Sequence, residues 1–129
     1  MKLLLDTHVW LWSILTPERL SHRSREALVS PDNELWLSPI SLWETLLLAE
    51  RGRIALEADP LTWISEARNA APVVEAPLTF EVAVASRTIS LPHEDPADRF
   101  ITATAKVYQL KLMTADRQLS RCPDIEIFE

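Results

Sequence analysis

The sequence predicts an α/β domain in which helices flank a central, mostly parallel sheet of four to five strands. Segments typical of strands and of helices alternate along the whole chain. The first segment, residues 2–5, runs through three consecutive leucines without any polar alternation, which is typical of a strand buried on both faces. The length of 129 residues suits one domain with one sizeable core, so we expect residues 1–129 to fold as a single unit.

Local signals support the individual elements. Ser38, Asp59 and Asp95 each precede a proline, and a capping residue followed by proline is the usual start of a helix. Gly52 is well placed to end the helix that starts after Ser38. The predicted strands are residues 2–5, 34–37, 72–75, 111–114 and 125–128, and the predicted helices are residues 8–15, 20–29, 39–51, 60–69, 79–86 and 96–109.

Composition excludes several classes of protein. The net charge of −6 argues against a broad basic face for nucleic acid, although carboxylates neutralised by metal ions stay compatible with a nuclease. A single glycine rules out the glycine-rich phosphate loops of P-loop and dinucleotide-binding proteins. The single cysteine rules out an internal disulfide and suits the reducing cytoplasm, and no apolar run approaches the ~18 residues that would span a membrane.

Four acidic residues occupy positions that could meet at one edge of the sheet. Asp6 and Asp116 each follow a predicted strand, and neighbouring parallel strands would bring them about 5 to 10 Å apart. Asp98 lies in the first turn of a helix, and Glu44 lies in the second turn of another. Helices that follow parallel strands begin at the carboxyl edge of the sheet, so all four carboxylates could converge there.

Each acid also has a purely structural interpretation. Asp95 and Asp98 could cap their helix, and Asp116 could begin a turn. Asp6 is hardest to explain in this way, because a carboxylate directly after three leucines is costly to bury without a partner. Together the acids would repel one another, and a hard divalent cation such as Mg²⁺ or Mn²⁺ would relieve that repulsion. Such an ion can activate water for in-line attack on a phosphodiester.

Several polar residues adjoin these acids. The hydroxyls of Thr7 and Thr114 could orient water or phosphate, or simply cap helices. Arg99 could contact phosphate, but we favour an ion pair with the acids just before it in the chain. His8 and His93 also lie close by, and an ordinary histidine is the better interpretation of each.

Five tryptophans are many for a chain of this length. We expect Trp36 and Trp43 to fill the core, together with Leu61 from the following helix. Trp10 and Trp12 cannot both face the same side of one helix, so one of them could be exposed. An exposed aromatic there would suit a protein interface or a platform on which RNA bases stack.

Four segments, taken in this order, resemble the PIN domain, and most closely the VapC-type toxins of bacterial toxin–antitoxin pairs. The segments are residues 4–12, 38–44, 91–101 and 112–117. The resemblance covers nearly the whole chain and implies a PIN-like three-layer sandwich. It also implies a metal-dependent ribonuclease in the cytoplasm, a homodimer, and a small antitoxin protein that holds the enzyme inactive.

The resemblance further implies a set of site residues. Asp6, Glu44, Asp98 and Asp116 match the acids that hold one or two Mg²⁺ or Mn²⁺ ions and are the catalytic residues. Asp95 would be an additional outer carboxylate. Among the other neighbours, Thr114 matches the hydroxyl that precedes the last acid of the family, and Thr7 and Arg99 would lie around the metal ligands.

Other functions stay open at this point. A non-catalytic PIN fold that binds RNA or protein would share the same motifs. A different magnesium-dependent phosphohydrolase, of the haloacid dehalogenase type, also places an aspartate after its first strand. That class needs a second aspartate two residues later, where this chain has His8. A response-regulator receiver needs a pair of acids at its first strand and a lysine after its last, and the chain has neither.

Overall fold

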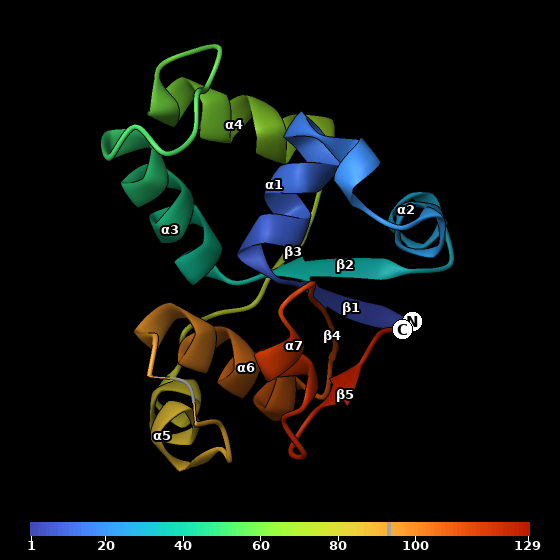
Figure 1. The fold of residues 1–129 in the computed structure, drawn as a ribbon, viewed down its shortest axis with the longest axis vertical. Coiled ribbons are helices and arrows are strands. Elements are labelled where there is room, and N and C mark those ends of the chain that lie inside the picture. Colours follow the sequence, from blue (N-terminus) through green and yellow to red (C-terminus); the bar gives the residue numbers. More distant parts are fainter. Residues whose placement is uncertain (93) are drawn as a thin grey trace.

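The structure is a computed structural model that describes residues 1–92 and 94–129, and it contains a five-stranded, all-parallel sheet. The strand order is β3–β2–β1–β4–β5, which confirms the predicted α/β class with β1 at the centre (Figure 1). The strands are β1 (Lys2–Leu5), β2 (Glu34–Leu37), β3 (Val74–Glu75), β4 (Lys111–Met113) and β5 (Glu126–Ile127).

The leucines of β1 explain its central position. Leu3, Leu4 and Leu5 are each exposed by 1% or less. Leu4 faces one part of the core, whereas Leu3 and Leu5 face another, so β1 is buried on both sides. Leu4 lies opposite Trp36 of β2 and Leu112 of β4, and this register brings the ends of β1 and β4 together.

Helices cover both faces of the sheet and give three layers, as expected. The helical segments are α1 (Thr7–Leu15), η1 (Pro17–Arg19), α2 (His22–Val29), α3 (Pro39–Glu50), α4 (Pro60–Ala70), α5 (Phe80–Thr88), α6 (Pro96–Tyr108) and α7 (Arg117–Ser120). Helices α1, α2 and α4 lie on one side, and α5, α6 and α7 lie on the other (Figure 1). No helix in residues 1–92 and 94–129 has the length and apolar character needed to cross a bilayer.

The predicted helix starts are confirmed. The side chain of Ser38 accepts a hydrogen bond from the Ile40 amide, and that of Asp59 accepts one from the Thr62 amide. Asp95 caps α6 in the same way. Since each capping residue is followed by proline, the backbone is set for a helix at all three positions.

Two helices end in left-handed residues. Gly52 has φ +67°, its amide donates to the Ala49 carbonyl, and the next amide donates to Leu48, which is the Schellman arrangement. Gln109 ends α6 with φ +55°, although a glycine would adopt this conformation with less strain.

Parts of the predicted core are wrong. Trp43 and Leu61 are 55% and 72% exposed. On α3 the buried residues are the polar Ser41 and Thr45, because this helix meets α1 through a polar contact that apolar periodicity cannot indicate. On α4 the buried residues are Trp63 and Ala67, and Leu61 is not among them.

Of the two tryptophans of the first helix, Trp10 is the one that is buried in the core. Trp10 is 1% exposed and packs edge-on against Trp63, with ring centroids 5.8 Å apart. Trp12 is half-buried, at the surface of the same helix. Trp36 is also half-buried and packs on Tyr108. Two short elements, η1 and α7, were not predicted.

Candidate active site

Asp6 lies at the carboxyl end of β1, where it joins the sheet to α1. Its amide donates to the Met113 carbonyl at 3.0 Å, which continues the pairing of β1 with β4. Its Oδ1 accepts from the Thr7 amide at 2.8 Å and thereby caps α1. Its Oδ2 accepts from the Thr114 hydroxyl at 2.7 Å. The carboxylate is only 5% exposed, and both of its oxygens are oriented by the protein.

Asp116 follows β4 and is joined to Asp6 through Thr114. The Thr114 hydroxyl donates to Asp6 and accepts from the Asp116 amide at 3.0 Å. Asp116 then caps α7, with Oδ1 accepting from the Gln118 amide at 2.8 Å. The two strand-end acids therefore lie at the same edge of the sheet, where Thr114 connects the Asp6 carboxylate with the Asp116 backbone.

Glu44 approaches from α3 and is joined to the end of β1 through Thr7. The Thr7 hydroxyl is hydrogen-bonded to Glu44 Oε1 and lies 2.9 Å from the Ser41 hydroxyl. A hydroxyl carries one proton, so with Glu44 ionised Thr7 donates to Glu44 and accepts from Ser41. Ser41 was missed in the sequence, and its position three residues before Glu44, on the same face of α3, is the signal that could have indicated it.

Asp95 and Asp98 come from the start of α6. Asp95 is exposed and its Oδ1 accepts from the amides of Ala97 and Asp98, at 2.9 and 3.4 Å. Asp98 is half-buried. Both acids contribute negative charge that acts on Glu44 of α3, so the helix start at α6 and the second turn of α3 face the same region.

Several of these acids act on one another electrostatically. Burial raises the pKa of Asp6, and the charge of Asp116 adds to this, while the hydrogen bonds from Thr114 and Thr7 and the charge of His8 oppose it. Burial also raises the pKa of Glu44 against the hydrogen bond from Thr7, and the charges of Asp98, Asp6 and Asp95 act in the same direction as burial. Ionised carboxylates at this edge therefore destabilise one another.

The donor set fits a hard divalent cation. Carboxylate and hydroxyl oxygens are the ligands that Mg²⁺ and Mn²⁺ prefer, and a cation would offset both the burial and the mutual repulsion that raise the pKa values of Asp6 and Glu44. In residues 1–92 and 94–129, no three histidine, cysteine or acidic side chains already stand close enough to hold a metal ion together. Ions bound here would therefore draw the acids closer or use water between them.

Arg99 is placed differently from the expectation. It is 5% exposed, and its guanidinium donates to the backbone carbonyls of Ser86, Ile89 and Leu91. These contacts tie α6 to the end of α5, so the favoured ion pair with Glu94 or Asp95 is not what positions this side chain. The other neighbour considered, the histidine at position 93, lies outside the described residues.

The chain resembles known proteins over nearly its whole length. A family model described as PIN domain matches residues 3–125. Ribonuclease VapC22 from Mycobacterium tuberculosis is 38% identical over 120 residues, which cover 90% of this chain and 88% of that protein.

Solved structures share the fold. VapBC2 from Rickettsia felis, bound to a DNA fragment from its promoter, superposes with a TM-score of 0.74 at 14% identity and covers 99% of this chain and 98% of its own. FitAcB from Neisseria gonorrhoeae gives a TM-score of 0.67 at 23% identity, with coverage of 98% and 96%. Because the family model matches residues 3–125, which is nearly the whole sequence, the chain belongs to the PIN domain family.

Proposed function

We propose that this protein is a metal-dependent endoribonuclease that acts as the toxin of a toxin–antitoxin pair and hydrolyses RNA phosphodiester bonds. The observation that carries the proposal is the buried Asp6 carboxylate, oriented by Thr7 and Thr114 within reach of the charge of Asp116. A buried, oriented acid among other acids is typical of a metal centre and has little value for stability. The relative named Ribonuclease VapC22 supports RNA as the substrate.

The acids would have different roles in binding the metal ions. Asp6, Asp98 and Asp116, with Glu44 directly or through water, would hold one or two Mg²⁺ or Mn²⁺ ions. When bound, these ions supply a Lewis acid that activates water and stabilises charge on the phosphate. Thr114 fixes Oδ2 of Asp6 and leaves a lone pair for ligation, and Thr7 does the same for Oε1 of Glu44. Asp95 would remain an outer carboxylate, because both of its known hydrogen bonds cap α6.

Partners are proposed on the same basis. VapBC2 is one structural relative, and another is named as a toxin–antitoxin complex from Klebsiella pneumoniae, which supports a small antitoxin protein as the partner of this chain. Phe80 and Val84 of α5 are 94% and 66% exposed, and so apolar a surface supports a homodimer. The cytoplasm is the expected location, since the single cysteine is free.

The test is cleavage of single-stranded RNA with Mg²⁺ or Mn²⁺. We expect products with 5′-phosphate and 3′-hydroxyl ends, and Asp6→Asn and Asp98→Asn should each lower the rate about 100-fold or more. Asp59→Asn is the matched control, because Asp59 also caps a helix but stands away from the site. Asparagine caps helices as well as aspartate does, so the Asp6 and Asp59 variants should fold. Asp98→Asn should also fold, because Asp95 and not Asp98 caps α6.

Each rival function has its own outcome. Equal cleavage by the wild type and Asp6→Asn would show that the assigned site is wrong. Tight RNA binding without any cleavage would favour the binding module. Release of inorganic phosphate from a phosphomonoester, with RNA left intact, would favour the other phosphohydrolase class.

A further inference from the structure

A groove with a cavity volume of about 670 Å³ lies beside the acids and takes no part in holding them. It is formed by α1, η1 and the chain that follows α3, and its lining includes His8, Trp12, Arg19, Leu48 and Arg53. His8 is two residues after Asp6, and its charge acts on the Asp6 carboxylate. The groove therefore adjoins the candidate active site through His8, although none of the candidate acids lines it.

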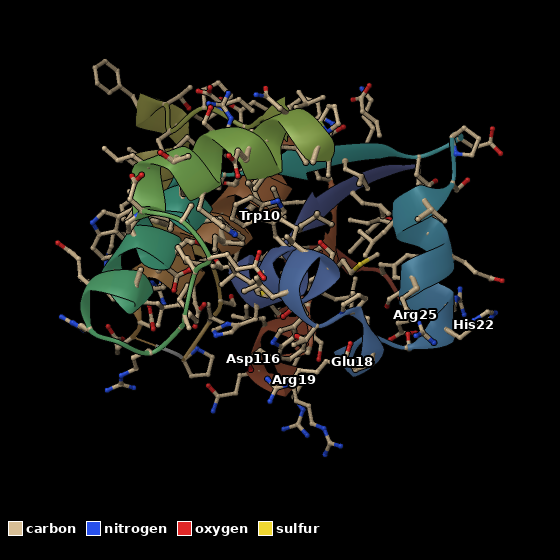
Figure 2. All side chains as sticks on the ribbon, turned by 90° about the horizontal axis from the view of Figure 1, so that it is seen from above. Trp10, Glu18, Arg19, His22, Arg25 and Asp116 are labelled. Atoms are coloured by element: carbon tan, nitrogen blue, oxygen red, sulfur yellow. The ribbon has the colours of Figure 1, made fainter. Side chains whose placement is uncertain are left out.

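Two arginines line this groove although the protein as a whole is acidic. Arg19 comes from η1 and Arg53 from the chain after α3, and the lining also includes one acid, Glu57. Figure 2 shows Arg19 on the same side of the molecule as Asp116, the acid that follows β4. An RNA strand at the acids would thus find compensating charge in this direction.

The aromatic centre of the groove is Trp12, which is half-buried. The guanidinium carbon of Arg19 lies 5.3 Å from the centroid of its ring, and the His8 ring lies 6.0 Å away, tilted by 55°. Aromatic rings and arginine planes are the surfaces on which unpaired bases stack. The neighbouring Leu15 and Leu48 provide apolar surface for the edge of such a base.

We propose that this groove binds an unpaired nucleotide of the RNA next to the scissile phosphate. The base stacks against Trp12, and Arg19 and Arg53 contact the flanking phosphates. This inference rests on the proposed function and deepens it by naming the residues that bind one base, whose face must be unpaired and unstacked to reach Trp12. A protein partner would fill the same apolar surface, but it would not account for the combination of ring, guanidinium planes and adjacent acids.

The experiment compares Trp12→Ala, Trp12→Phe and Arg19→Ala in two assays. In the Asp98→Asn background with Mg²⁺, we expect Trp12→Ala to bind a short single-stranded RNA about 5- to 150-fold more weakly, which is the loss of one base stack. Trp12→Phe should restore most of the binding. Arg19→Ala should lower the slope of log K against log salt by about 0.7, the value for one phosphate of a single strand, and Arg87→Ala on α5 should not change it.

The second assay measures cleavage in the otherwise wild-type protein. We expect Trp12→Ala to raise KM by a similar factor with little change in kcat, and replacement of one nucleotide by an abasic site to have the same effect as the mutation. Thermal melts of each variant check that a weak binder is still folded. Cleavage with unchanged KM and salt slope in Trp12→Ala and Arg19→Ala would overturn the inference while leaving the ribonuclease in place.

Two further outcomes are decisive. If the wild type cleaves no RNA, the proposed function fails and the groove loses its substrate. If Trp12→Ala and Arg19→Ala keep RNA binding but lose binding to the antitoxin, the groove is a protein-binding site and the inference is wrong.

Discussion

The substitution Asp6→Asn should make the metal-free protein more stable and should abolish its stabilisation by metal. Asparagine keeps the acceptor for the Thr7 amide, so the cap of α1 is preserved. The carboxylate that it replaces is buried, and burial raises its pKa. A folded protein that binds the proton more tightly than the unfolded chain loses stability as the pH rises from about 4 through the raised pKa.

The magnitudes follow from the same contacts. Each pKa unit by which burial outweighs the hydrogen bonds from Thr7 and Thr114 corresponds to about 1.4 kcal/mol at neutral pH. For a domain of 129 residues, 1 kcal/mol shifts Tm by about 3 to 5 °C. Metal at 100 times its Kd stabilises the wild type by about 2.7 kcal/mol, or roughly 10 °C, and the increase grows with pH because the ligands must be deprotonated.

The assay is thermal unfolding, followed by tryptophan fluorescence, across a pH series with a chelator and with excess Mg²⁺ or Mn²⁺. Asp59→Asn is the control, since Asp59 caps α4 at the surface and hydrogen bonds from Thr62 lower its pKa. That variant should keep the full metal shift. The reasoning is refuted if Asp6→Asn retains the metal shift, or if its metal-free Tm falls clearly below that of the wild type.

The remaining predictions concern the surroundings of the site. Thr114→Val removes the hydroxyl that lies between the Asp6 carboxylate and the Asp116 amide, so the cleavage rate at neutral pH should fall about 10-fold and the pH optimum should move higher. Thr114→Ser should restore the rate. An unchanged pH profile in Thr114→Val would contradict the role of this hydroxyl in orienting Asp6. Gln109→Gly should raise the free energy of unfolding in urea by about 1 kcal/mol, and Gly52→Ala should lower it by a similar amount; two changes of the same sign would contradict the backbone argument. Arg99→Met leaves three backbone carbonyls without the Arg99 donor and should lower the free energy of unfolding in urea by about 3 kcal/mol or more. A loss of cleavage with an unchanged free energy of unfolding would show instead that Arg99 acts in the active site.

The sequence predicts the fold because its local signals agree with one another. The three leucines of β1 and the helix starts at Ser38, Asp59 and Asp95 are each decided by neighbouring residues, and the structure confirms all of them. The convergence of Asp6 with Asp116 depends on β1 and β4 being parallel neighbours, a pairing that the sequence permits and the structure shows.

What the sequence could not predict depends on contacts between distant residues. Ser41 and Thr45 are buried because α3 meets α1 through hydroxyls, and helical periodicity then assigns Trp43 to the wrong side. Arg99 looked like a member of the site because it follows an acid, yet carbonyls of α5 and the next loop hold it. These are long-range choices between polar partners, and apolar patterns contain no information about them.

Asp6, Asp95 and Asp116 serve at once as candidate site acids and as the residues that begin helices α1, α6 and α7. Replacement by asparagine removes the charge and keeps the cap, so the chemistry can be lost while the architecture is kept or even strengthened. Chemistry that depends on these charges could therefore be lost from a lineage through single aspartate-to-asparagine changes while the fold is kept.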